Sequence, residues 1–229
     1  MAPNALLSVV LKKCKESLKM TASAKAYRQF AESDYRLREC FGSIIHAFMN
    51  IPLNTSRKAI SKNEEDHYPP NDYIDEQSGA QCFMHRHASG QRDSLHIHFF
   101  KRWQPPHIEL NQQITTHIAA LDLSLTGEPL GWFLVNQWVV GDYWQEAKKT
   151  LKFAKEWRID DGNSKQDSYL PNKLIANWLN TVMSLAVKTS LPELLHERDK
   201  RIDRALSLNP NRQILLDKRI EVMGYSRFY

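Results

Sequence analysis

The sequence predicts an α+β protein in which an antiparallel sheet of about four strands, over residues 81–140, is packed on one face by N- and C-terminal helices. Two observations predict this class. Apolar residues recur with helical spacing up to Gly42, alternate with polar residues between positions 81 and 140, and return to helical spacing after Asp142. The 229 residues, 42% of them apolar, are also enough to bury one core, so we expect a single domain over residues 1–229.

Helices are expected towards both ends of the chain. Residues 1–42 should form two helices, because apolar residues recur at helical spacing between Leu6 and Leu18 and again after Ser23. Residues 142–206 should be helical as well, with Asp142 as an N-cap. A basic tail over residues 207–229 should follow.

The strands should lie between these helical parts. Residues 50–78 contain Pro52, Pro69 and Pro70 and a polar run, which predicts a long irregular connection before the sheet. Polar loops and a tight Thr126-Gly127 turn should join the strands into a meander. The expected strands are residues 81–88, 94–103, 114–125 and 129–140.

Composition narrows the location and the partners. Three cysteines without a CxxC pair argue against a disulfide framework or a four-cysteine zinc site and favour a reducing cytoplasm. The N-terminal apolar run lacks the features of a signal peptide, and no segment is long and apolar enough to predict a membrane span. The net charge of +5 is spread along the chain, so it does not favour nucleic acid as a partner.

Four of the nine histidines stand in two His-x-His pairs, His85 with His87 and His96 with His98. Residues two apart on a strand share one face, so both pairs should point to the same side of a hairpin. If the loop SGQRD closes the hairpin symmetrically, the facing pairs are His87 with His96, His85 with His98, and Phe83 with Phe100. The opposite face should pack under the helices through Cys82, Met84, Leu95, Ile97 and Phe99.

The next two strands can extend this histidine surface. His117 can share the face by alternation, and the Thr126-Gly127 turn then sets Asn136 opposite His117 and Trp138 opposite Thr115. We therefore expect Asn136, Trp138 and Thr115 to line a ligand site beside the imidazoles.

The clustering of imidazoles suggests a metal. Two imidazolium ions at cross-strand distance would repel by roughly a few kcal/mol at an effective dielectric of about 20, and a divalent metal relieves this conflict. The predicted ligands of a divalent metal such as zinc are His85, His87, His96, His98 and His117. A neutral, hydrogen-bonded histidine network that binds an anionic ligand is an equally matched alternative. No carboxylate stands at an obvious ligand position on this face.

Several stretches resemble one uncharacterised bacterial protein family of unknown function. They are FMHRH, SLHIHFF, THIAALDLSLTGEPLGWFLVNQWVVGDYW and LLDKRIEVM, which together cover about residues 80–150 and part of the C-terminal segment. The resemblance supports the grouping of the histidines with Asn136 and Trp138, and it implies no reaction.

The strand HIHFF also resembles the metal-binding strand of rolling-circle and relaxase endonucleases. That resemblance implies a DNA nickase with Tyr143 as the nucleophile, although Lys148 follows Tyr143 at five positions rather than the usual three. The sequence thus leaves three functions in order: a metal-dependent, hydrolase-like enzyme, a binding module for a small anionic ligand, and a nickase.

Overall fold

The computed structural model describes residues 21–52, 67–87, 94–106, 113–161, 171–210, 213–218 and 224–228. The first expected helix, between Leu6 and Leu18, and the loop SGQRD lie outside these residues, so both stay predictions.

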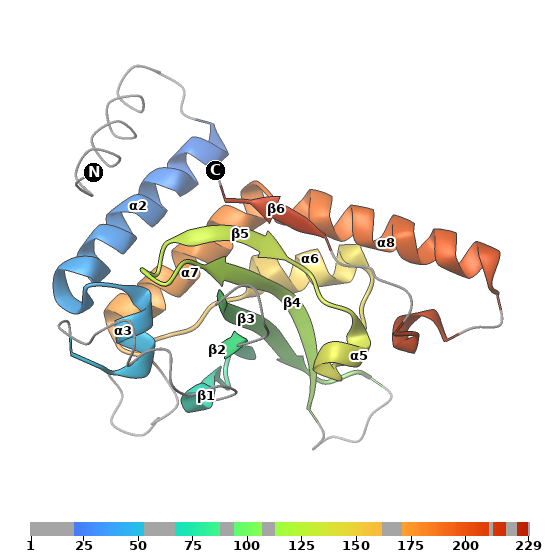
Figure 1. Cartoon of the computed structure of the whole chain (residues 1–229), viewed down its shortest axis with the longest axis horizontal. Helices are drawn as coiled ribbons and strands as arrows, with labels where there is room; N and C mark the ends of the chain where they lie inside the picture. The colour runs from blue at the N-terminus through green and yellow to red at the C-terminus, as the bar shows by residue number, and fades with distance from the viewer. Residues whose placement is uncertain are drawn as a thin grey trace.

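Six strands form one sheet in which every neighbouring pair is antiparallel. Their spatial order is the order of the chain (Figure 1): β1 (Tyr68–Asp75), β2 (Ala80–His87), β3 (Ser94–Trp103), β4 (Ile114–Leu123), β5 (Pro129–Phe133) and β6 (Tyr225–Arg227). The predicted α+β class is confirmed, with β1 and β6 added to the expected strands.

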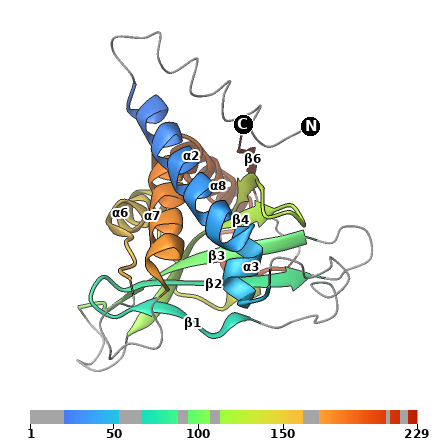
Figure 2. The same ribbon diagram turned by 90° about the vertical axis from the view of Figure 1, so that its left-hand side faces the viewer.

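The helices are α2 (Ala22–Phe41), α3 (Ile44–Met49), α5 (Gln137–Val140), α6 (Ala147–Glu156), α7 (Lys173–Lys188), α8 (Leu191–Leu208) and the 3-10 turn η1 (Ile214–Leu216). Side-chain caps fix where α2 and α7 begin: Thr21 Oγ1 accepts a hydrogen bond from the Ala24 N–H, and Asn172 Oδ1 accepts from the N–H groups of Leu174 and Ile175. Helices α6 and α7 lie on one side of the sheet in both views (Figures 1 and 2).

β1 lies inside the segment 50–78 that the sequence predicted to be irregular. Pro69 and Pro70 obscure the strand signal because they lack the N–H that a strand donates, and an edge strand tolerates them since only one of its sides is paired. The pairing of β1 with β2 accordingly shifts register between Tyr68 and Tyr73. The predicted tail over residues 207–229 also contains a strand that the sequence did not predict. This strand, β6, is three residues long and pairs with β5.

The predicted strand over residues 129–140 is wrong beyond Phe133. β5 ends there, and α5 follows, closed by Gly141 at a φ of 64°. Asp142 is not a helix N-cap either, because α6 begins only after Glu146. The Asp142 carboxylate instead accepts a hydrogen bond of 2.6 Å from the backbone N–H of His117.

The helix-covered face of the sheet holds the hydrophobic core. Its residues on β2 and β3 are those expected from alternation, and none is more than 1% exposed: Cys82, Met84, Leu95, Ile97 and Phe99. Trp157, at the end of α6, packs its ring on Phe99 at 5.1 Å between centroids and donates a hydrogen bond to the Phe100 carbonyl. Helix α2 packs on α7 through Phe30 and Trp178, whose rings are 5.6 Å apart.

Truncation of Ile97 tests this core. Ile97 is fully buried, so Ile97→Ala should lower the free energy of unfolding by about 2–5 kcal/mol through lost burial and a cavity. Leu208→Ala, at a position 73% exposed on α8, should change it by less than about 0.5 kcal/mol. Urea unfolding followed by tryptophan fluorescence measures both, and equal losses would contradict the assignment of faces.

Candidate functional site

The sheet face opposite the core, here called the histidine face, contains the predicted imidazoles of β2 and β3. His85 stands directly opposite His96, and Phe83 stands opposite His98. The predicted pairing of His85 with His98 and of His87 with His96 is therefore wrong by two residues, because β2 and β3 pair as far as His87 with Ser94. A shift of two keeps every side chain on its predicted face, since the side-chain period of a strand is two. The side chain of His87 lies outside the described part of the structure.

A β-bulge brings His117 to the histidine face. On β4, Ala119 pairs with Phe99 but His117 pairs with Phe100, so Ile118 is an extra residue. In a regular strand of the same sequence, alternation from Ala120 and Asp122 would turn His117 towards the helices. His117 therefore lies on the histidine face, as predicted, but because of the bulge and not because of regular alternation.

Three imidazoles on this face are in direct contact. His98 Nε2 lies 3.2 Å from His85 Nε2, and His98 Nδ1 lies 3.1 Å from His117 Nε2. The rings of His85 and His98 meet edge to face with centroids 4.6 Å apart. His98 and His117 are only 3% and 6% exposed, so this contact reaches from the buried interior towards the half-buried His85.

His117 is held neutral. Its burial, together with the positive charge of Arg198, lowers the pKa of His117 to about 3. Arg198 is itself buried, lies 4.0 Å from the Trp144 ring centroid and pairs with Asp199 at 2.8 Å. A neutral His117 can accept a hydrogen bond at Nε2, so His98 can donate through Nδ1 and keep the lone pair of its Nε2 directed at His85.

A carboxylate also lies on the histidine face, contrary to the sequence prediction. Asp122 stands opposite His96, and its Oδ1 lies 3.3 Å from His96 Nδ1. At this distance the two atoms are in ion-pair contact without hydrogen-bond geometry, and a small rotation of the ring would let Nδ1 donate to the carboxylate. Such a bond leaves Nε2 as a lone-pair donor, which is the usual support of a metal-binding histidine. Asp122 and His117 are an odd number of residues apart, so regular alternation assigns them to opposite faces of the sheet. The bulge between them brings both to the histidine face, and the sequence does not show the bulge.

Of the three predicted ligand-binding residues, Asn136 and Trp138 are placed differently from the expectation, while Thr115 lies on the same side of β4 as His117. The β4–β5 register is the one predicted, as Ala120 facing Phe133 shows, but β5 stops before it reaches Asn136. Asn136 is buried at the start of α5, while Trp138 on α5 is 39% exposed with Lys218 Nζ 5.5 Å from its ring centroid. Thr115 pairs with Arg102 on β3, and its carbonyl accepts a hydrogen bond from the Tyr143 N–H.

Sequence reasoning missed a second imidazole–carboxylate pair beside the face. His67 stacks on Phe83 with ring centroids 3.9 Å apart, and its Nδ1 lies 3.4 Å from Asp72 Oδ1. Gln81 Nε2 donates to the other oxygen of Asp72 at 2.7 Å, and Asp72 has a φ of 56°, which is unusual outside glycine. The sequence offers no periodic signal for this pair because it depends on the irregular start of β1.

Within the described ranges, no group of three or more His, Cys, Asp or Glu side chains is already arranged as a metal site. The described helices also include none that is both long and apolar enough to cross a membrane.

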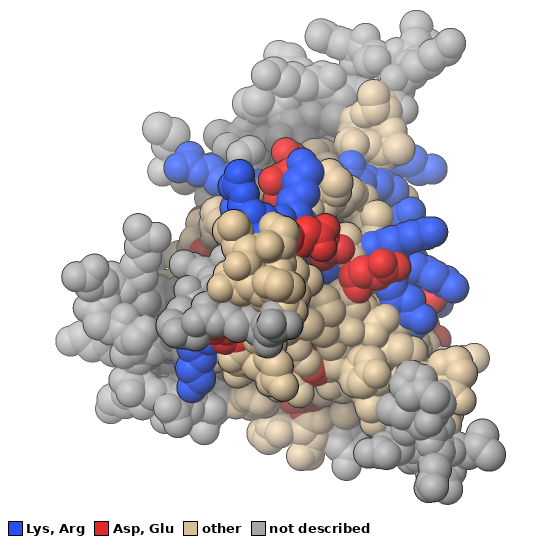
Figure 3. Space-filling model, turned by 90° about the vertical axis from the view of Figure 1, so that its right-hand side faces the viewer, with Lys and Arg blue, Asp and Glu red and all other residues tan. Residues whose placement is uncertain are grey.

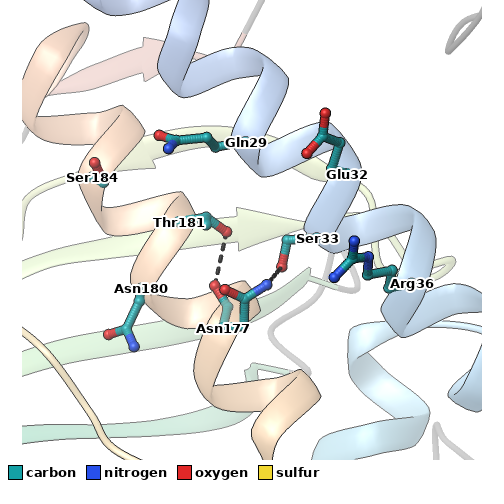
Figure 4. Close-up of a pocket in the computed structure, with 8 residues that line it drawn as sticks. All are labelled: Gln29, Glu32, Ser33, Arg36, Asn177, Asn180, Thr181 and Ser184. Carbon is teal, nitrogen blue, oxygen red and sulfur yellow. Dashed lines mark hydrogen bonds between the residues drawn. The ribbon is translucent and has the colours of Figure 1, made fainter.

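A separate groove of about 280 Å³ lies between α2 and α7 (Figure 4). Its lining contains no imidazole and is partly hydrogen-bonded within itself, as Asn177 Nδ2 donates to Ser33 Oγ at 2.9 Å. The histidine face therefore remains the candidate site.

Comparison with protein families matches residues 31–228 to a model described as a domain of unknown function (DUF6969). No curated protein and no solved structure matches the chain.

The depressed pKa of His117 predicts acid sensitivity. Its folded-state value of about 3 lies below the ordinary 6.5, so the unfolded chain binds a proton there that the folded chain excludes. The stability of the wild type relative to His117→Gln should be constant above pH 6.5 and fall by about 1.4 kcal/mol per pH unit at most between 6.5 and 3. Urea unfolding across this range measures it, and parallel pH profiles for the two proteins would contradict the neutral, buried state.

The contribution of Asp142 to stability should change with pH in the opposite direction. Burial raises the pKa of Asp142 from 3.8 to about 6, so the folded protein binds this proton more tightly than the unfolded chain. The stability of the wild type relative to Asp142→Asn should therefore be greatest below pH 3.8 and decrease as the pH rises to 6. The same titration in urea measures it, and an advantage that grows with pH would rule this assignment out.

Proposed function

Because the chain belongs to the DUF6969 family, whose description names no activity, we propose from the geometry that the histidine face binds a divalent transition metal, preferably zinc, as the centre of a hydrolase-like enzyme. The observation that carries the proposal is the approach of His85 Nε2 to His98 Nε2 at 3.2 Å. Two nitrogen ligands at about 2.0–2.1 Å from a tetrahedral zinc ion are about 3.3–3.4 Å apart, so the two atoms already have the spacing of one edge of such a site.

The surroundings of these two imidazoles support the same proposal. His98 Nδ1 faces His117, whose pKa of about 3 keeps it neutral, so His117 Nε2 can accept a hydrogen bond from His98 Nδ1 and His98 Nε2 is left as a lone-pair donor. A bound metal would remove the repulsion that protonated neighbours would suffer in this buried cluster.

The third ligand in this proposal is His96, oriented by Asp122. Its ring centroid lies 6.1 Å from that of His85 and 6.3 Å from that of His98, so a rotation of its side chain would close the site. His87 is the remaining predicted donor on β2. Three imidazole ligands leave a fourth position for water, whose pKa a zinc ion lowers to about 7, which supplies a hydroxide for hydrolysis.

The second candidate is a binding module for a small anion. The same 3.1 and 3.2 Å contacts between imidazoles are also within the range of N–H···N hydrogen bonds in a neutral network. In that case inorganic phosphate should bind more tightly at about pH 6 than at pH 8, because each imidazole that takes up a proton adds a positive charge to the histidine face.

A nickase has less support. The Tyr143 ring packs edge-on against Trp103 at 6.0 Å, and alternation places Trp103 on the helix-covered face, away from the imidazoles. On the side drawn in Figure 3, acidic side chains lie among the basic ones. Opposite charges are also paired on α8, where Lys200 and Glu197 are 2.7 Å apart. We therefore propose a small-molecule substrate in the cytoplasm, without a nucleic-acid or membrane partner.

Metal uptake decides between the first two candidates. Untagged protein should contain or take up zinc, manganese or iron stoichiometrically, and the double variant His96→Ala/His98→Ala should lose it because too few donors remain. The matched control His46→Ala/His196→Ala removes two imidazoles elsewhere, one bonded to Ser43 Oγ and one exposed on α8, and should keep the metal.

Elemental analysis after reconstitution and desalting gives the metal content of all three proteins. If the wild type stays free of metal, the metal proposal is wrong, and calorimetry with inorganic phosphate then tests the anion-binding module. If wild type and both variants hold equal metal, the site lies elsewhere. Release of nitrophenol from a nitrophenyl ester by metal-loaded wild type, but not by the His96→Ala/His98→Ala variant, would support the enzyme.

A further inference from the structure

The C-terminal strand reaches the histidine face through one side chain. Tyr225 lies on β6 opposite Phe133, and its hydroxyl donates a hydrogen bond of 3.3 Å to Asp122 Oδ2. Asp122 belongs to β4, so the tyrosine ring must cross β5 to reach it. The contact joins residues 103 positions apart in the chain.

The sequence of β5 provides the space for this crossing. Gly131 lies between the two residues, paired with Asp122 on one side and with Arg227 on the other. A Cβ atom at this glycine would stand 2.4 Å from Tyr225 Cζ, 2.5 Å from the hydroxyl oxygen and 2.7 Å from the Ser226 carbonyl oxygen. Any side chain at position 131 would therefore displace the ring and also press on the backbone of β6.

We propose that Tyr225 is a positioning residue of the histidine site and acts through Asp122 on His96. Asp122 Oδ2 accepts from Tyr225, and Asp122 Oδ1 lies 3.3 Å from His96 Nδ1, within ion-pair distance but without the geometry of a hydrogen bond. With the carboxylate fixed at Oδ2, a small rotation of the His96 ring would let Nδ1 donate to Oδ1, which keeps the proton on Nδ1 and the lone pair on Nε2. Only the consequence for metal affinity rests on the proposed function.

The tautomer of His96 is the first measurement, because it needs no metal. In metal-free protein at about pH 8, where ordinary imidazoles are neutral, ¹⁵N long-range NMR correlations should show His96 protonated on Nδ1. Tyr225→Phe removes only the hydroxyl and should shift His96 to a mixture of tautomers. Gly131→Ala should give the same mixture by displacing the ring, and Asp122→Asn should give the largest change.

Tyr27→Phe is the matched control. Its hydroxyl also bonds to the C-terminal segment, donating to the Phe228 carbonyl at 3.2 Å, but it does not reach Asp122. Tyr27→Phe should therefore leave the His96 spectrum unchanged, which separates a loss of positioning from a general loosening of the C-terminal segment. An identical His96 tautomer in wild type, Tyr225→Phe and Tyr27→Phe would overturn the proposal, whether or not a metal binds.

Zinc affinity, from competition with a chromophoric chelator, is the second measurement. Tyr225→Phe and Asp122→Asn should weaken zinc binding by about 10- to 100-fold, the usual effect of losing a partner that orients a ligand, while Tyr27→Phe should not. If the wild type binds zinc and Tyr225→Phe binds it equally well, the positioning role is wrong and the metal site stands. If no protein binds zinc, the metal function is wrong, and the tautomer measurement alone decides the role of Tyr225.

Discussion

The bulge in β4 is the constraint on which the histidine face depends. Its extra residue, Ile118, is fully buried, and it reverses the alternation of everything before it on the strand. Thr116 thereby turns to the helix side, where its hydroxyl accepts from Trp103 Nε1 and donates to the Tyr143 carbonyl, while His117 turns to His98. One inserted residue thus gives both Thr116 and His117 a polar partner, and a regular strand of the same sequence would place an imidazole in the core.

Much of the sheet could be predicted from the sequence because a strand has only two faces. The alternation of Leu95, Ile97 and Phe99 with His96 and His98 assigns each residue of β3 to the core or to the histidine face, and an error of two in register leaves that assignment intact. The α+β class follows from the change between the helical and the alternating period.

The parts of the structure that could not be predicted depend on features that leave no repeating pattern of apolar and polar residues in the sequence. A bulge leaves no mark in the alternation before the pairing is known, so Asp122 and His117 could not both be assigned to the histidine face. Strand β1 could not be predicted because it contains two prolines, which are rare in strands. The end of β5 at Phe133 could not be predicted because the helix that follows has only four residues, too few to show a helical pattern. The contact of Tyr225 with Asp122 depends on a pairing between distant parts of the chain, which local patterns do not contain.

Because the strands lie in sequential order, β1 and β6 are the edge strands, and they determine whether a strand of another chain can pair with the sheet. Its two edges are β1, which has two prolines and an irregular pairing, and β6, which is three residues long. Prolines, irregularities and short length each make an edge a poor template for a strand from another molecule, because few N–H and C=O groups are presented in register. The two described edges are therefore poor sites for aggregation by strand addition.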